Sequence, residues 1–579
     1  MKREKGMNLD DQARETAYRL ERSGTGAGVG WFSCVPEAAV DLEQALEYLE
    51  TSPRDRFMHQ HVLERLAEQD FEVLEALVER GKAGEPHVLA LAYEACMVSE
   101  RFQGLLERFR DVELPGLTPF SPLIRIPWSL EKASDARLFW LQRFSHNSIR
   151  HVPLPLPGEA EYPVPVPQDA VEAWRRRIVP VHRMPPAGPL LDRGASKGKE
   201  RPARKAATAL QRKLEALGIL EGWETRTEAT LSPFAVERPW RVDVRTHQGR
   251  NRCRLSGTQT SYGRGLNIHQ ARMSCLMEVA ERHAAFPSVD QDRLPGYSGN
   301  PRLITGTARE MEARGFRTLD LGRVRLEVPY RGDPLAWMGA EERTEQGTRS
   351  ILVPAQLAFL FTNLDEAGLT SGLSSTGLGA GDTMEEARLS GLLEVIERDA
   401  ERVVPFSPDR VFELEADEPR VQGMLSDLER KGIHIRFADL TSEFGVPCYQ
   451  AFVEGPGGVI LKGAGAHLDG RRAAVSAMTE IPWPYPYWFG TTPAPEDLRR
   501  VSFEDLPCWG TGNASDDLAH LEALLLANGY FPVYVDLTRE DTAIPVCRVL
   551  VPGLEMMTSF DRFTPLGLRQ FAHYLDLFS

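Results

Sequence analysis

Two segments of the sequence carry paired glutamates at a spacing suited to binding metal and phosphate. Residues 263–284 and 379–400 align without a gap at an offset of 116 residues, and eleven of the 22 positions are identical. Each segment contains Glu-x-x-Glu-Arg, which places two carboxylates three residues apart on one face of an expected helix. A single pair of this kind is most often solvated helix surface, but both of these helices are otherwise apolar.

The repeat predicts that the two glutamate pairs face each other. The carboxylates are Glu278 and Glu281 in the first segment, and Glu394 and Glu397 in the second. Four carboxylates in one cleft raise each other's pKa values unless a cation compensates them. Hard oxygen ligands favour Mg²⁺, which commonly carries nucleotide phosphates. A Gly-x-Gly turn opens each segment, and such a turn lets backbone amides approach an anion.

These motifs resemble those of the YcaO superfamily, whose members use ATP to activate peptide-backbone amides. The first nucleotide motif of that family is matched by Ser274, Glu278, Glu281 and Arg282. The second is matched by Gly377, Gly381, Glu386, Ala387, Glu394, Glu397, Arg398 and Asp399. The resemblance covers about residues 208–563 and implies an α/β (α+β) YcaO-like domain with an internal pseudosymmetric repeat.

The resemblance also implies the cofactors and the reaction. ATP and Mg²⁺ are the expected cofactors, with metal at Glu278, Glu281, Glu394 and Glu397. Asp382 and Glu386 are supporting ligands, Arg282 and Arg398 orient carboxylates or contact phosphate, and Ser274 belongs to the same nucleotide site. The expected enzyme phosphorylates an amide of a peptide or protein, leading to cyclodehydration or thioamidation-type modification. No catalytic residue is assigned.

Several positions depart from the family pattern. Ser375-Thr376-Gly377 stands where Ser-Asn-Gly is usual, and Gly379 lacks the hydroxyl expected in that turn. In the third motif, SAMTEIPWPYPYWFG (476–490), Glu480 is present but no glutamine or arginine follows it; Arg471 and Arg472 precede it and could substitute. The aromatic run at 483–489 predicts either a core loop or a wall for substrate or adenine. GAGAH (463–467) fits a strand bulge or a nucleotide contact.

Two further regions precede the expected domain at 208–579. Residues 1–112 predict an all-α helical module, with helices at 10–22, 36–51, 53–69, 71–80 and 87–110 and an N-cap at Ser52 before Pro53. Residues 113–207 form a Pro-rich linker, in which 152–168 is expected to run extended as a strap. The helical module is a plausible docking surface for a partner protein, and a homodimer is also possible.

Composition limits the classes of partner. The 579-residue chain has 83 acidic and 68 basic residues, a net charge of −15, which disfavours sequence-blind binding to nucleic acid. No apolar run reaches the roughly 20 residues that span a bilayer, and no secretory signal is apparent. Seven scattered cysteines without a C-x-x-C pair fit a reducing compartment. We therefore expect a cytoplasmic protein that binds neither membrane nor nucleic acid.

Two alternatives to the enzyme stay open at this stage. The altered third motif would suit a non-catalytic member that acts as a peptide-binding scaffold. The helical module would suit an accessory factor in ribosomal protein methylthiolation, a role suggested for stand-alone members of the superfamily.

Overall fold

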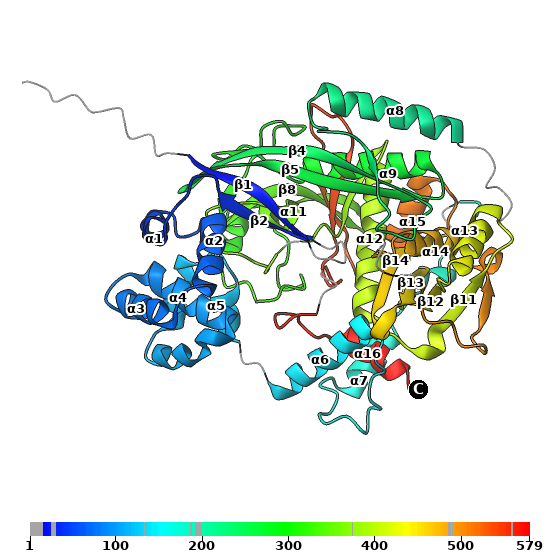
Figure 1. Cartoon of the computed structure of the whole chain (residues 1–579), viewed down its shortest axis with the longest axis horizontal. Helices are drawn as coiled ribbons and strands as arrows, with labels where there is room; N and C mark the ends of the chain where they lie inside the picture. Colours follow the sequence, from blue (N-terminus) through cyan, green and yellow to red (C-terminus); the bar gives the residue numbers. More distant parts are fainter. Residues whose placement is uncertain are drawn as a thin grey trace, which may run out of the picture.

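The computed structural model describes residues 15–24, 30–131, 134–185, 188–190, 200–372, 374–484, 488, 490–556 and 560–579. Within these residues, three β-sheets and the helices packed on them form a mixed α/β architecture (Figure 1). The start of the helix expected at 10–22 and most of the aromatic run at 483–489 lie outside the described residues. None of the described helices combines the length and hydropathy that crossing a bilayer requires.

The first sheet has the strand order β2-β1-β5-β4-β3, with β6 beside β4. Its strands are β1 (Thr16–Gly24), β2 (Gly30–Pro36), β3 (Thr225–Arg226), β4 (Phe234–Gln248), β5 (Asn251–Gly265) and β6 (Val289–Asp290). β4 and β5 form a long antiparallel hairpin, from Phe234 opposite Gly265 to Gln248 opposite Asn251. Helix α9 (Ile268–Ala284) packs on this hairpin, so the first glutamate pair sits against the first sheet.

The second sheet has the order β10-β17-β16-β8-β7, with β9 beside β8. Its strands are β7 (Ile304–Gly306), β8 (Leu335–Thr344), β9 (Gly347–Pro354), β10 (Leu378–Ala380), β16 (Val533–Asp536) and β17 (Val546–Leu550). Helix α12 (Met384–Val403) carries the second glutamate pair and packs on β10 and β17.

The third sheet has the order β14-β13-β12-β11-β15 and is covered by α14 (Gly470–Thr479). Its strands are β11 (Val411–Glu415), β12 (Arg436–Asp439), β13 (Cys448–Glu454), β14 (Ile460–Ala466) and β15 (Arg500–Ser502). The other α-helices after residue 300 are α10 (Ala308–Ala313), α11 (Ala355–Ala358), α13 (Pro419–Arg430), α15 (Ala514–Ala527) and α16 (Leu568–Asp576). Each of the three sheets is therefore covered by one main helix: α9 on the first, α12 on the second and α14 on the third.

The prediction of an all-α N-terminal module is wrong at its start. Residues 16–24 form β1, which pairs antiparallel with β2 and parallel with β5 of the first sheet. Tyr18 and Leu20, two residues apart, are both buried. This spacing is the two-residue period of a strand. In Figure 1 these two strands lie along the β4–β5 hairpin.

Helices do follow these strands. They are α1 (Leu42–Thr51), α2 (Arg56–Ala67), α3 (Phe71–Lys82), α4 (Pro86–Val98) and α5 (Arg125–Ser129). The predicted cap at Ser52 is wrong, because the Asp55 side chain accepts the hydrogen bonds from the first amides of α2. Buried residues of α1–α4 and of the first two sheets belong to one continuous apolar core.

The Pro-rich region holds more helix than expected. It contains α6 (Asp135–Arg150), α7 (Gln168–Arg175) and the start of α8 (Glu200–Ala216). Between α6 and α7, residues 151–167 form neither helix nor strand. Prolines of this stretch accept side-chain hydrogen bonds, Pro163 from Trp140 and Pro155 from Tyr574. The stretch is thereby fastened to α6 and to the C-terminal helix α16, which lie close together in Figure 1.

Candidate functional site

A strand glycine packs against the main helix of each sheet with the same spacing. A Cβ on Gly263 of β5 would lie 2.0 Å from the carbonyl oxygen of Ala271 and 2.3 Å from the amide of Cys275. Gly379 meets Ala387 and Gly391 in the same way, and Gly465 meets Ala473 and Ala477. In all three cases the contacts fall eight and twelve residues after the glycine. Only glycine allows strand and helix backbones to come this close.

The same spacing continues to three pairs of a serine and a glutamate. Eleven residues after each glycine stands a serine, and fifteen residues after it a glutamate: Ser274 and Glu278, Ser390 and Glu394, Ser476 and Glu480. Sequence analysis found this pattern in α9 and α12 but missed its third occurrence, which ends just after α14. The signal that could have revealed it is the GAGAH turn, which contains Gly465.

Backbone amides of neighbouring strands and turns orient three of the glutamates. One carboxylate oxygen of Glu278 accepts a hydrogen bond from the Tyr262 amide at 3.0 Å. Glu394 accepts one from the Gly377 amide at 3.1 Å, and Glu397 one from the Ala466 amide at 2.9 Å. Each carboxylate is thus fixed through one oxygen, and its other oxygen faces the arginines described below.

Helices α9 and α12 both contact β10 and β17, and the charges of the two glutamate pairs act on each other's pKa values. Burial raises the pKa of Glu281 to about 8, and the charges of Glu394 and Glu278 add to this while Arg282 opposes it. Burial likewise raises the pKa of Glu397 to about 8, with Glu480, Glu401 and Glu394 adding to it. The pKa of Glu394 is also raised by burial. Carboxylates from α9, from α12 and from the end of α14 therefore form one cluster.

Two motif arginines lie between these carboxylates. Arg282 Nε is 3.6 Å from Glu278 and 3.7 Å from Glu281. Arg398 is 3.9 Å from Glu394, 3.3 Å from Glu397 and 2.7 Å from Glu401. Although burial acts to lower them, the pKa values of both guanidinium groups are raised by the surrounding glutamates. The arginines thus supply part of the positive charge that these carboxylates require, beside the predicted metal.

Arg548 on β17 is a third arginine of the cluster and was not predicted. Its side chain is fully buried, and burial lowers its pKa to about 10, while Glu394 and Glu281 act against this decrease. One terminal nitrogen donates to the Ser374 carbonyl at 2.9 Å. Its Nε and Nη1 have no hydrogen-bond partner among the residues that the structure describes. Unsatisfied buried donors of this kind fit an anion such as a phosphate group.

Other predicted residues lie apart from the cluster. Ser274 is exposed, one helical turn before Glu278. Asp382 and Glu386 are exposed at the N-terminal end of α12, where Glu386 accepts a hydrogen bond from the Asp382 amide at 2.9 Å. Eight residues of helix separate Glu386 from Glu394, about 12 Å along the axis. Arg471 is engaged with Asp469 at 2.9 Å, so its pairing does not support the predicted substitute role.

The family model described as "YcaO cyclodehydratase, ATP- and Mg²⁺-binding" matches residues 262–482 and 487–555, half of the chain. The matched residues contain all three strand–helix units and Arg548. The chain belongs to the YcaO family. ATP and Mg²⁺ are accordingly its cofactors, as the sequence motifs predicted.

Two relatives match about half of the chain. An uncharacterized protein of Methanothermobacter thermautotrophicus is 30% identical over 332 residues, covering 51% of this chain and 82% of its own. A second, of Rhizobium leguminosarum bv. trifolii, is described as an uncharacterized protein in the tfuA 3′ region. It is 26% identical over 354 residues, covering 53% of this chain and 79% of its own. Both alignments leave almost half of this YcaO chain uncovered.

Solved structures were also compared with the whole chain. A YcaO protein from Methanopyrus kandleri bound with AMPPCP and Mg²⁺ aligns with a TM-score of 0.44 and 22% identity, covering 63% of this chain and 94% of its own. A heterocyclase in complex with substrate and cofactor aligns with a TM-score of 0.44 and 19% identity; the match covers 61% of this chain but spans only 52% of that one.

The residues present fit a magnesium nucleotide. The cluster supplies oriented carboxylate oxygens, which Mg²⁺ prefers, and the free Arg548 donors suit phosphate oxygens. In the described residues, no three His, Cys, Asp or Glu side chains are close enough to hold a metal by themselves. Mg²⁺ at protein sites commonly keeps phosphate and water among its ligands, so one or two carboxylates here suffice.

Proposed function

We propose that this YcaO protein is an enzyme that uses ATP and Mg²⁺ to phosphorylate a backbone amide of a peptide or protein. The modification that follows is of the cyclodehydration or thioamidation type. The observation that carries the proposal is the arrangement of the motif carboxylates, which lie within 4 Å of Arg282 on α9 and of Arg398 on α12. Both helices contact β17, which carries the buried donors of Arg548 that have no partner among the described residues. A scaffold has no need of buried carboxylates with such costly ionisation.

We assign the following roles within the cluster. Glu278, Glu281, Glu394 and Glu397 hold Mg²⁺, with Asp382 and Glu386 supporting the nucleotide from the start of α12. Arg282 and Arg398 orient the carboxylates and oppose the rise of their pKa values, and Arg548 donates to phosphate oxygens. Bound ATP and Mg²⁺ supply a transferable phosphoryl group whose charge is partly neutralised. The protein contributes positioning and electrostatic stabilisation, the main needs of phosphoryl transfer.

The bond changes balance without an oxidant or reductant. The amide oxygen forms a bond to the γ-phosphorus while the bond from that phosphorus to the bridging oxygen of ADP breaks. A thiol or hydroxyl of the substrate, or external sulfide, bonds to the amide carbon and gives up its proton. The former amide oxygen then leaves as part of inorganic phosphate. A substrate side chain as nucleophile gives a ring, in which the amide nitrogen also loses its proton as the C=N bond forms. Sulfide gives a thioamide, in which the nitrogen keeps its proton.

Calorimetry with ATP tests the proposed site. Wild-type protein should bind ATP in the presence of Mg²⁺ and lose most of this affinity in EDTA. Glu281→Gln and Glu397→Gln each remove a carboxylate charge with little change in volume, and each should weaken Mg²⁺-dependent binding by about tenfold or more, on the order of 1.4 kcal/mol. Glu385→Gln is the matched control, because Glu385 is exposed at the start of the same helix.

The same variants separate an enzyme from a scaffold. For an enzyme, ATP turnover stimulated by a substrate peptide should fall by about 100-fold in Glu397→Gln, on the order of 2.7 kcal/mol of transition-state stabilisation. A scaffold would bind its peptide equally well before and after the substitution. Equal ATP affinity in EDTA, or full affinity in both cluster variants, would refute the assigned site.

A further inference from the structure

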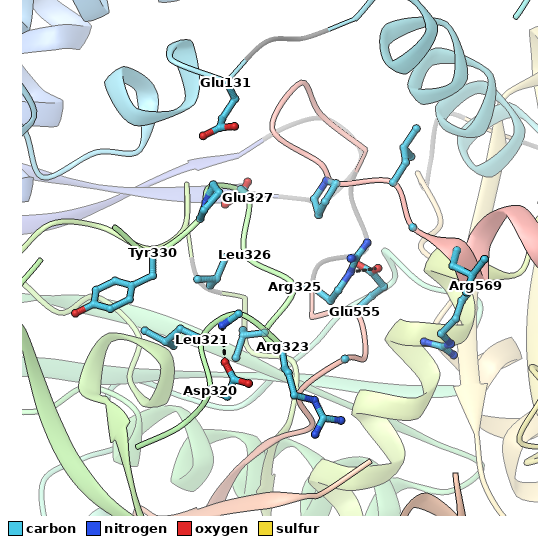
Figure 2. A pocket seen from close by; sticks show the side chains of 18 of the residues that line it. Glu131, Asp320, Leu321, Arg323, Arg325, Leu326, Glu327, Tyr330, Glu555 and Arg569 are labelled. Carbon is cyan, nitrogen blue, oxygen red and sulfur yellow. Dashed lines mark hydrogen bonds and ion pairs between the residues drawn. The ribbon is translucent and has the colours of Figure 1, made fainter. Parts of the chain in front are cut away.

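A cavity with a volume of about 1250 Å³ lies outside the glutamate cluster. It is larger than the roughly 300–1,000 Å³ typical of sites for drug-sized ligands. Its walls mix apolar side chains, including Trp128, Leu321 and Phe571, with charged ones such as Arg325 and Glu555. Of these, Leu321, Arg325 and Glu555 can be followed in Figure 2. A cavity of this size and mixed character suits a polymer segment better than a small molecule.

The walls come from two kinds of sequence. One side is formed by residues 318–330 and by Gly553 and Glu555, which lie within the family match. The other side comes from the start of α6, the Pro-rich stretch and residues 565–571, all outside that match. The cavity is thus formed jointly by residues inside and outside the family match. Such an arrangement is expected where an enzyme carries out the reaction of its family on a substrate of its own.

Arg325 offers an unused hydrogen-bond donor at this cavity. Its Nε donates to Glu555 at 2.9 Å, and Figure 2 shows the two side chains joined. Its Nη2 is buried and has no partner among the described residues. Because a buried donor without an acceptor costs about 1–3 kcal/mol, an occupant with carbonyl or carboxylate oxygens would be favoured. A peptide presents a carbonyl at every residue.

Two chains of contacts link the cavity wall to elements of the glutamate cluster. Arg569 lines the cavity and pairs with Asp399 at 2.6 Å, two residues after Glu397 on α12. Glu555 also lines it, and the next residue, Met556, accepts a hydrogen bond from Ser374. The Ser374 carbonyl in turn accepts from Arg548 of the cluster. One helix and two linked residues therefore separate the cavity from the proposed phosphate contact.

We propose that this cavity binds a segment of the substrate polypeptide and directs it toward the nucleotide. The inference rests on the proposed function for the identity of the occupant. Arg325 donates to an oxygen of the bound peptide, the apolar walls accept its side chains, and the segments outside the family match determine which sequences fit. A flanking part of the substrate occupies the cavity, and the reacting amide extends past Glu555.

Random twelve-residue peptides displayed on phage provide a probe. They are selected on the full-length protein with Mg²⁺ and a non-hydrolysable ATP analogue present, and the enriched peptides are then synthesised. Ala136 is half-buried on the cavity wall, so Ala136→Trp should fill the space and weaken peptide binding by tenfold or more. Leu138→Trp is the matched control, because Leu138 is 44% exposed on the same helix and does not line the cavity.

Arg325→Leu, which removes the donor without filling the cavity, should also weaken peptide binding by about tenfold. ATP affinity should change less than twofold in all three variants. Failure to enrich any peptide, or equal binding to wild type and Ala136→Trp, would overturn the inference. If the peptide test fails but the protein still binds ATP normally, the proposed function stands. A protein that binds peptides in the cavity but no ATP would overturn the proposed function and leave the peptide site standing.

Discussion

Arg548 is the residue at which the motif-based prediction of the site was least complete. It stands alone in an apolar strand, so no spacing in the sequence links it to the glutamates. Its position follows from the pairing of β17 with β10, which sets Arg548 opposite Leu378. That pairing places it beside the turn whose Gly377 amide holds Glu394. Because no arginine follows Glu480 within the third motif (476–490), we expect Arg548 to make the phosphate contact that this motif lacks.

Substitution of Arg548 should weaken nucleotide binding more when the nucleotide carries more phosphate groups. We expect Arg548→Met, which retains most of the volume, to weaken ATP binding by about 10- to 100-fold, on the order of 1.4–2.7 kcal/mol. Adenosine binding should stay within twofold, and Arg548→Lys should recover part of the loss. Calorimetry with adenosine, ADP and ATP measures the series. An equal loss for all three ligands would instead indicate a purely structural role.

Among individual residues of the site, the sequence predicted those that belong to a repeated motif. Glu278, Glu281, Glu394 and Glu397 were found because a helical period and a fixed offset mark them. In the structure, the charge of Glu394 adds to the raised pKa of Glu281. Their metal ligation stays a prediction. Glu401 was missed although it stands one turn after Glu397, because it belongs to no repeated motif; Arg398 contacts it at 2.7 Å.

The strand–helix unit is the element that positions the glutamates. Its glycine removes the only side chain that would separate strand from helix, and the helix then presents its glutamate fifteen residues later. We expect Gly379→Ala to disrupt this contact, because a Cβ there would lie 2.2 Å from the Ala387 carbonyl oxygen. Such overpacking typically costs about 1–3 kcal/mol. The melting temperature should fall, and ATP affinity should fall with it.

Gly423→Ala is the matched control for this prediction. Gly423 lies inside α13, and a Cβ there meets no atom within 4 Å. Alanine in a helix interior stabilises by about 0.5–1 kcal/mol relative to glycine, so the melting temperature should rise slightly. An unchanged melting temperature in Gly379→Ala would show that the strand and helix can separate without cost, contrary to the role given to this glycine.

Elements with strong periodicity were predicted better than the ends of the chain. The helices that carry the two motifs were found in outline. Strand β1 was mistaken for helix although β2 pairs with it nearby in the sequence. The strand that joins this pair to the first sheet is β5, which lies more than 230 residues away. Pseudosymmetry of the whole domain stays a prediction, although three glycines with identical helix contacts support it.

At the scale of the whole molecule, a buried charge cluster ties the C-terminus to α12. Arg569 of α16 forms two 2.6 Å bonds with Asp399 and one with Glu443, and His573 contacts Glu443 at 2.9 Å. Arg569→Leu would leave two buried carboxylates without this partner. Loss of one member of a buried ion pair typically costs about 3–5 kcal/mol. We therefore expect a lower melting temperature and faster amide exchange in α16.

Arg176→Leu serves as the control, because this arginine is 75% exposed on the surface; it should leave the melting temperature almost unchanged. Equal effects of the two substitutions would contradict the anchoring role of Arg569.

The same cluster predicts a pH dependence of stability. Burial by itself would raise the pKa of Glu443, but Arg569 and His573 outweigh it and hold the pKa at about 2. A lowered pKa in the folded state stabilises the protein above the unfolded value of about 4.3. That contribution is lost as the pH falls from about 4 to about 2. Glu443→Gln should therefore unfold with a weaker pH dependence in this range, as acid titration followed by circular dichroism would show.

The location of the metal tests the central claim most directly. Crystals grown with AMPPCP and Mn²⁺, which replaces Mg²⁺ at oxygen sites and scatters X-rays anomalously, would show the ion position without assumption. The account predicts an anomalous peak within metal–ligand distance, about 2.1 Å for Mg²⁺, of at least one carboxylate among Glu278, Glu281, Glu394 and Glu397. It also predicts a phosphate oxygen within hydrogen-bond distance of Arg548. A peak elsewhere, for example beside Arg325 in the cavity, with the four glutamates unligated, would contradict the account.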